Sequence, residues 1–226
     1  ISELNVKYLL SLIFTFLLAF GASAEQELKD RGHLELVDGK NYYELGLQID
    51  LLEDETKNLT IDDIVSSKYD NQFKRSKKEV PSFGFKKANF WAKITLLNNT
   101  RNQKSWLFHQ QNYTQDEITV YRKIEGQWKH STTGDFFPFK TREVDARSFS
   151  FHIEAPVNKV TIFYVQITGV VNRMLFTLTT PTHFAEEEAK DNYVMGLFFG
   201  LILTIIALNS VLYLSTKEKG YLYYVL

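Results

Sequence analysis

The stretch TTGDFFPFKTREVDAR, near the middle of the chain, carries the side chains best suited to binding a ligand. Aromatic faces beside an arginine can stack on a sugar ring, and the arginine fork can clamp a carboxylate. A turn at Gly134 and the rigid Pro138 would hold these groups together. The alternative is that the phenylalanines seal one end of a β-sandwich while the arginines are solvated or paired with Glu143 and Asp145. The ligand-binding candidates in this stretch are Asp135, Phe139, Arg142 and Arg147.

The tryptophans are a second source of ligand contacts. In the alternating run FWAKITLLN, Trp91 shares its face with Lys93 and Thr95. A tryptophan on the polar face of a strand presents a flat apolar ring with a polar N–H, which suits a ligand platform. Trp91 is therefore the fifth ligand-binding candidate, whereas Trp106 and Trp128 stay ambiguous between core and site.

The chain lacks the patterns that carry most catalytic and metal chemistry. It has no cysteine, which excludes disulfides, thiolate chemistry and cysteine-based metal centres. No two of its histidines lie four residues apart, and no phosphate-binding loop or hydrolase motif occurs. Asp116 and Glu117 read as turn and strand-start residues, because nothing in the sequence fixes a second carboxylate across a cleft. We expect no catalytic residue, no metal and no cofactor, and we do not expect this chain itself to be an enzyme.

The overall charge gives no reason to expect nucleic acid as a partner. The 226 residues carry 26 basic and 27 acidic side chains, which leaves a formal net charge of −1. Nucleic-acid-binding domains usually show a clear excess or stripe of positive charge. The aromatic content of 15% is high and suits β-strands around a large core.

Short alternating runs fill residues 25–182 and predict strands. In FWAKITLLN, Ala92, Ile94 and Leu96 share one face, and the denser VTIFYVQIT predicts a central strand buried on both faces. Turn signals such as NNTRNQ, KIEGQ and APVNK separate these runs at the spacing of an antiparallel sandwich. The stretch NLTIDDIV predicts one short helix that begins with a capping box. We therefore expect an all-β exported domain, an antiparallel jelly-roll sandwich.

The first residues have the pattern of a secretory signal peptide. Lys7 gives a positive start, Tyr8–Phe20 is apolar, and Ala22-Ser23-Ala24 supplies the small residues of a cleavage site. This pattern predicts a signal peptide over 1–24, and the alternative is a membrane anchor that is retained. The apolar run is short for a span, which needs about 20 residues.

A second apolar run, Tyr193–Leu214, is long enough to cross a bilayer and contains no charged residue. Lys217 and Lys219 follow it directly, which places that end in the cytoplasm by the positive-inside rule. The cleaved signal peptide places the domain before it outside, so the two arguments agree. The charged stretch over 183–192 predicts a linker helix that transmits movement, and the alternative is a passive solvated connector.

The last twelve residues predict the beginning of a second span. Residues 215–220 read as a short cytoplasmic loop with Gly220 as its turn, and YLYYVL at 221–226 reads as the start of the next helix. The alternative is an aromatic tail on the membrane surface. The first interpretation makes the chain the front piece of a multi-pass protein of the bacterial inner membrane, with its N-terminal domain in the periplasm.

The span has two features that favour helix packing. Gly196 and Gly200 form a G-x-x-x-G pair that allows close approach of another helix, in a bundle or in a homodimer. Asn209 is the one strongly polar group in the run, and we expect it to donate a hydrogen bond to a neighbouring helix. The alternative for Asn209 is a partly wetted position near the cytoplasmic end.

Two blocks of the sequence carry a family resemblance. LEDETKNLTIDDI, FWAKITLLNNT, TGDFFPFKTRE and SFSFHI, between Leu34 and Pro181, resemble the second type of extracellular domain of the bacterial seven-transmembrane receptors with diverse intracellular signalling modules. The block GLFFGLILTIIALNSVLYLSTKEKGYLYYVL resembles the start of their membrane module, although Leu208 stands where a tyrosine is expected before Asn209. The resemblance implies a jelly roll related to carbohydrate-binding modules, a small ligand that is often a sugar, and a cytoplasmic kinase, cyclase or phosphatase output domain.

These observations predict the N-terminal part of a transmembrane receptor. Its sandwich senses an extracytoplasmic ligand, carbohydrate or small carboxylate, and its helix bundle relays the change to a cytoplasmic output domain. The partners expected are a small-molecule ligand, the lipid bilayer, that output domain and a second copy in a homodimer. The alternatives are a membrane-tethered exported glycan-binding module or glycan-acting enzyme, and a structural β-domain anchored at the envelope.

Overall fold

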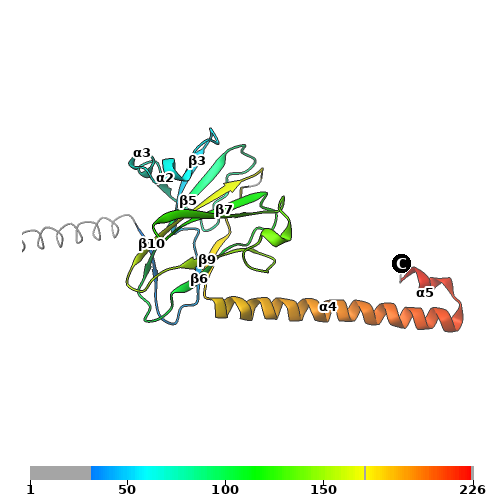
Figure 1. The fold of residues 1–226 in the computed structure, drawn as a ribbon. Helices are drawn as coiled ribbons and strands as arrows, with labels where there is room; N and C mark the ends of the chain where they lie inside the picture. The colour runs from blue at the N-terminus through cyan, green and yellow to red at the C-terminus, as the bar shows by residue number, and fades with distance from the viewer. Residues whose placement is uncertain (1–31, 171, 225–226) are drawn as a thin grey trace, which may run out of the picture. The chain divides into compact units, whose positions relative to one another are not determined.

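The computed structural model describes residues 32–170 and 172–224, and the predicted signal peptide at 1–24 lies outside these described residues. The chain divides into two compact units, the first ending at Thr180 and the second beginning at Pro181. Among the described residues, every strand belongs to the first unit, and the second unit is helical (Figure 1).

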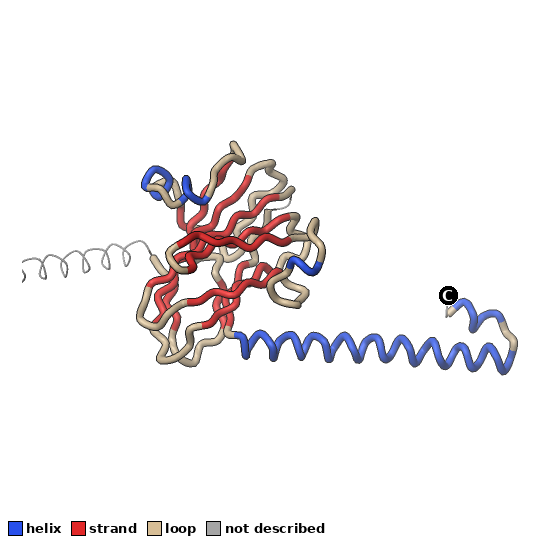
Figure 2. The backbone as a smooth tube through the Cα atoms, in the orientation of Figure 1, coloured by secondary structure: helices blue, strands red, loops and turns tan. Residues whose placement is uncertain are grey.

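The first unit is a β-sandwich of two mainly antiparallel sheets (Figure 2), as the sequence predicts. One parallel strand pair, between β1 and β5, belongs to the larger sheet. The finer prediction of a jelly roll stays a prediction. In spatial order the larger sheet comprises β4 (Lys74–Arg75), β3 (Ile49–Asp54), β5 (Asn89–Asn98), β10 (Val160–Thr168), β7 (Glu117–Ile124) and β8 (Gln127–Thr133), with β1 (Leu34–Leu36) paired to the far end of β5. The smaller sheet comprises β2 (Tyr42–Glu44), β11 (Phe176–Thr179), β6 (Ser105–Gln110) and β9 (Phe149–Glu154).

The core forms between the inner faces of the two sheets. Ala92, Ile94 and Leu96 of β5 are fully buried there, on the single face that their alternation predicts. Phenylalanines fill the centre, where the ring of Phe108 on β6 lies 5.4 Å from that of Phe163 on β10. Strand β10 lies between β5 and β7, which confirms the central strand predicted from VTIFYVQIT.

A second apolar cluster lies on the outer face of the larger sheet. It contains Leu52, Trp91 and Tyr164, with Ile64 from the short helix α2 (Ile61–Ile64). The capping box predicted for this helix is present: the Thr60 hydroxyl accepts from the Asp63 N–H, and the Asp63 carboxylate accepts from the Thr60 N–H at 2.9 Å. Helix α3 (Ser67–Asp70) follows directly, and the 3₁₀ helix η1 (Phe139–Thr141) lies in the β8–β9 loop.

The second unit consists of α4 (Pro181–Thr216) and α5 (Lys219–Tyr223). The predicted linker at 183–192 and the predicted span at 193–214 belong to the single helix α4, which begins at a proline, a residue the first helical turn accepts. Its apolar part has a mean hydropathy of 2.3, enough by length and composition to cross a membrane. Asn209 donates to the Ile205 carbonyl of its own helix at 2.9 Å, and its bond to a neighbouring helix stays a prediction, as does packing through the Gly196–Gly200 pair.

The turn after α4 differs from the sequence prediction. Gly220 lies inside α5, so it is not the turn residue. The chain reverses at Lys217, which has a φ of 59° and donates its N–H to the Tyr213 carbonyl at 2.8 Å. The left-handed residue that ends a helix satisfies one of the helix's free carbonyls, and here a lysine takes that conformation instead of the glycine.

Candidate ligand site

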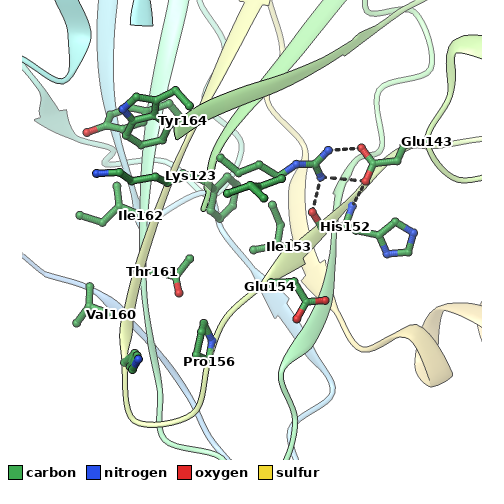
Figure 3. Close-up of a pocket in the computed structure, with 15 residues that line it drawn as sticks. Lys123, Glu143, His152, Ile153, Glu154, Pro156, Val160, Thr161, Ile162 and Tyr164 are labelled. Atoms are coloured by element: carbon green, nitrogen blue, oxygen red, sulfur yellow. Dashed lines mark hydrogen bonds and ion pairs between the residues drawn. The ribbon is translucent and has the colours of Figure 1, made fainter. Parts of the chain in front are cut away.

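A cavity of about 660 Å³ opens at one side of the sandwich, between β9 and β10 (Figure 3). The start of β10 forms one wall, β9 forms the other, and the end of the β7–β8 hairpin closes one side. We call this cavity the notch. Its volume lies within the range of small-molecule sites, roughly 300–1,000 Å³.

The notch exists because two strand ladders begin at different residues. Strand β10 pairs with β5 from Val160 onward, but its pairing with β7 begins only at Phe163, opposite Arg122. Beyond Arg122, strand β7 continues to Ile124 in its pairing with β8. Val160, Thr161 and Ile162 therefore have a strand partner on the β5 side alone. The hairpin thus separates from β10 at this point and leaves a gap beside the strand edge.

The hairpin turn accounts for this separation. Its two central residues, Glu125 and Gly126, have φ angles of 53° and 83°. Two consecutive positive values are the signature of the tight hairpin turn that imposes a strong right-handed twist on the flanking strands. A strongly twisted two-stranded end cannot continue the flatter ladder with β10, so the strands diverge.

The walls of the notch are mainly apolar. Ile153 and Phe163 are buried at its inner side, and Ile162 is half-buried at its outer side. Trp128 and Tyr164 lie beside the hairpin with their rings edge to face, 5.5 Å between centroids. Burial raises the pKa of Tyr164 to about 12, with a further contribution from the negative charge of Asp70, so its hydroxyl stays neutral.

A charged pair stands at the inner end of the notch. The Arg122 guanidinium donates to both carboxylate oxygens of Glu143, at 2.9 Å and 2.5 Å, and also to the His152 carbonyl. The Glu143 carboxylate accepts the His152 N–H at 3.0 Å. Burial of Glu143 opposes its ionised form, but the hydrogen bonds from Arg122 and His152 outweigh that effect and lower its pKa. The pair is therefore charged and already partnered, and it shapes the notch without offering a free charge.

The free charges at the rim are positive in sum. Lys123, Lys159 and Glu154 are exposed, and none of them makes an ion pair in the part of the chain that the structure describes. Two ammonium groups against one carboxylate leave one positive charge, because Arg122 and Glu143 neutralise each other. The notch thus combines apolar walls, an open strand edge and a cationic rim.

The predicted ligand residues of the β8–β9 loop are dispersed. Arg142 donates to the Ala146 and Arg147 carbonyls and lies 4.5 Å from the Phe139 ring centroid, so it ties the loop together. Asp135 and Arg147 are exposed on the loop and do not line the notch. From this loop the structure brings Glu143 to the notch, a residue that the sequence interpretation treated only as a partner for the arginines. The ligand-binding roles of Asp135, Phe139, Arg142 and Arg147 stay predictions.

Trp91 is buried and does not form an open ligand platform. Its side chain is 0% exposed, in the outer cluster, with its ring 5.3 Å from that of Tyr121. A ligand could reach it only after the covering residues moved, and its predicted role stays a prediction. The residues that sequence reasoning missed are Lys123, Lys159, Thr161 and Ile162, and no sequence signal marks them because the notch arises from strand register.

A second cavity, of about 710 Å³, lies at the opposite edge of the larger sheet. Strand β4 forms that edge, and the exposed side chains of Lys74, Lys77 and Lys78 surround the opening. Lysines on an edge strand protect it from pairing with other chains, so a protective role accounts for this cluster.

Comparison with known protein families identifies the domain that contains the notch. No curated protein matches this chain. The family model described as "7TMR-DISM extracellular 2" matches residues 46–180, which is more than half of the chain and includes β3 to β11 and the whole notch. The resemblance seen in the sequence is thereby confirmed, and the chain belongs to the family of membrane receptors that carry the 7TMR-DISM extracellular 2 domain.

Proposed function

We propose that this chain is the sensing part of a bacterial membrane receptor, and that its sandwich binds an extracytoplasmic ligand in the notch. The observation that carries the proposal is a mostly apolar cavity of about 660 Å³, inside the matched receptor domain, with two rim lysines that make no ion pair among the described residues. A small ligand with a carboxylate, or a saccharide with acidic groups, would complement these walls and charges. Lys123 and Lys159 would hold the carboxylate, while the sandwich itself performs no reaction.

The path of the signal follows from the order of the units along the chain. The last strand, β11, ends at Thr179, and α4 begins at Pro181, so one residue joins the sensor to the membrane helix. A ligand can shift such a receptor only by binding one of its two states more tightly. We propose that α4 crosses the inner membrane, that α5 begins a second span, and that the helices relay the shift to a cytoplasmic output domain. A homodimer through the Gly196–Gly200 face would suit this relay.

Two experiments test the topology. Reporter fusions after residue 100 and after Lys219 should report the outside and the cytoplasm, respectively. The coding sequence beyond Leu226 should encode further apolar spans, whereas a stop codon there would favour a tethered binding module. A cytoplasmic signal from the fusion at residue 100 would contradict the receptor proposal.

A ligand screen tests the site. The full chain in detergent is heated with saccharides and small carboxylates, and a ligand that binds raises its unfolding temperature by mass action. The rise should persist in the control Lys77→Glu, because Lys77 lies at the opposite sheet edge, and it should disappear in Lys159→Glu. A rise that is the same in all three proteins would place the site outside the notch.

A further inference from the structure

The open edge of β10 points to the kind of ligand that the notch accepts. We propose that the notch binds a short extended peptide, which adds to β10 as a strand and places a carboxylate between Lys123 and Lys159. This inference rests on the proposed function, in which the notch is the ligand site, and it names the ligand class.

The first argument is the direction of the main-chain groups of β10. The Asn98 N–H donates to the Lys159 carbonyl at 3.3 Å, so the main-chain groups of Lys159 point toward β5. In an antiparallel ladder the main-chain N–H and C=O of alternate residues point to the same neighbouring strand. Those of Thr161 therefore also point toward β5, whereas those of Val160 and Ile162 point to the opposite side. That side is the notch, where no strand of the described chain pairs with them. The Phe163–Arg122 pair closes the ladder through the Ile162 carbonyl, so the groups left as a template for another strand are the N–H of Ile162 and the N–H and C=O of Val160.

The second argument is the length of this edge. The residues Val160 to Ile162 span about 10 Å at the usual rise per strand residue. An added strand of three or four residues would cover the edge fully and would occupy the position that β7 leaves after Arg122. Peptide recognition by strand addition takes its affinity from such main-chain bonds and its specificity from pockets for alternate side chains.

The third argument is the match between the walls and a peptide. Along an added strand, side chains would point alternately to the inner and the outer side of the notch. The inner side presents Ile153 and Phe163, and the outer side presents Ile162 beside Trp128. An apolar side chain fits either side. The rim lysines then select a carboxylate, either an acidic side chain or the C-terminus of the peptide.

The aromatic residues favour a peptide over a neutral sugar. Sugar-binding sites commonly offer a free aromatic face, but Trp128 is half-buried and meets Tyr164 edge to face at 5.5 Å, and Tyr164 is buried. The two rings thus serve mainly as a wall. The unpaired main-chain groups of β10, by contrast, match the alternating donors and acceptors of a peptide.

The test measures peptide binding to the full chain in detergent by calorimetry. The probes are tetrapeptides of the form acetyl-Val-Xaa-Val-Glu with a free C-terminal carboxylate, each paired with an analogue whose central amides are N-methylated. Methylation removes the N–H donors and keeps the side chains and the charge. An oligomer of glucuronic acid serves as the saccharide probe, and the proteins are the parent chain, Lys159→Glu, Lys123→Glu and the control Lys77→Glu.

We expect at least one tetrapeptide to bind, with about tenfold weaker binding after methylation, which corresponds to the loss of one or two hydrogen bonds. Each notch substitution should weaken binding about fivefold or more, since it replaces an attraction with a repulsion, and Lys77→Glu should leave it unchanged.

Three outcomes overturn the inference. Absence of binding by every tetrapeptide, or equal binding of a tetrapeptide and its methylated analogue, rules out strand addition. Glucuronate binding that depends on Lys159, without peptide binding, also overturns it and leaves the notch as the ligand site. If no probe shows a dependence on the two notch lysines, the proposed function falls as well.

Discussion

Arg122 on β7 and Glu143 in the β8–β9 loop form a two-point ion pair that occupies both main-chain groups of His152 on β9. Strand β9 is the edge of the smaller sheet, and β7 belongs to the larger one. The pair therefore stands in for the strand partner that β9 lacks at this position, and it ties the two sheets together beside the notch. Its side chains are only 17% and 23% exposed, so water screens the pair weakly.

Removing the arginine should destabilise the sandwich. In Arg122→Met the Glu143 carboxylate stays half-buried without its cation, and the His152 carbonyl loses its donor. Loss of one partner of a partly buried pair should cost about 2–3 kcal/mol, between the values for surface and fully buried pairs. Urea unfolding of the full chain measures this loss. The control Arg101→Met breaks a pair with Asp38 in which the arginine is 90% exposed, and it should change stability by about 0.5 kcal/mol or less. Equal effects of the two substitutions would contradict the role of the Arg122 pair.

The stability of the sandwich should fall between neutral and mildly acid pH because of His109. Burial lowers the pKa of His109 from 6.5 to about 4, and its Nδ1 lies 2.7 Å from the Ser150 hydroxyl. Below pH 6.5 His109 binds a proton in the unfolded chain, whereas in the folded domain it binds this proton only below about pH 4. The unfolded state thus binds more protons in this window, and stability decreases as the pH falls.

Urea unfolding at about pH 7 and about pH 5 measures the size of this effect. Proton linkage at His109 should lower the free energy of unfolding by about 2 kcal/mol between the two. In His109→Gln the difference should shrink by that amount, because glutamine does not titrate. The matched control is His130→Gln, which removes an exposed imidazole and leaves the buried site around His109 intact. If the free energy of unfolding of His109→Gln still fell by the parent's amount between pH 7 and pH 5, His109 would not be the group responsible.

Gly46 should tolerate no side chain. A Cβ built on Gly46 would overlap the main-chain carbonyl of Glu79, which cannot move aside as a flexible side chain could. Gly46→Ala should therefore force the two backbone segments apart and cost about 2–3 kcal/mol. Gly39→Ala is the control: its φ of 79° costs a non-glycine residue about 1 kcal/mol, but nothing lies within 4 Å of the new Cβ. Thermal unfolding should rank the parent chain, Gly39→Ala and Gly46→Ala in that order, and a reversed order would contradict the close approach.

The sequence predicted those parts of the fold that follow from local pattern. The alternation around Ala92 placed β5 and its core face, and Thr60 with Asp63 located the start of α2, because periodicity and capping act within a few residues. The sequence did not predict that short helices bury the other face of β5, so Trp91 was interpreted as an exposed ligand platform. The cover comes from Ile61 and Ile64 of α2, earlier in the chain, and from Tyr121 on β7, later in the chain.

The candidate site could not be predicted from the sequence for a related reason. The notch depends on where the β10 ladder stops, at Phe163 on one side and Val160 on the other, and this register involves three strands that are distant in sequence. The turn KIEGQ was recognised, but its twist acts on strands outside the hairpin. Likewise Gly220 looked like the turn residue, whereas α4 ends at Thr216 and the chain reverses at Lys217, the first charged residue after the apolar run.

The apolar part of α4 should fail to anchor the chain when charges enter it. Leu203 and Ile206 lie near the middle of Tyr193–Leu214, where each lysine costs about 2.5–3.5 kcal/mol on insertion. The double variant Leu203→Lys with Ile206→Lys should therefore pay about 5–7 kcal/mol, more than a single helix of this hydropathy can offset. Alkaline washing of membranes measures the result: the parent chain and the control Leu203→Ala with Ile206→Ala should stay in the pellet, and the lysine variant should appear in the wash or be degraded. Retention of the lysine variant at the level of the parent chain would show that another part of the protein holds it in the membrane, and α4 would lose its assignment as the anchor.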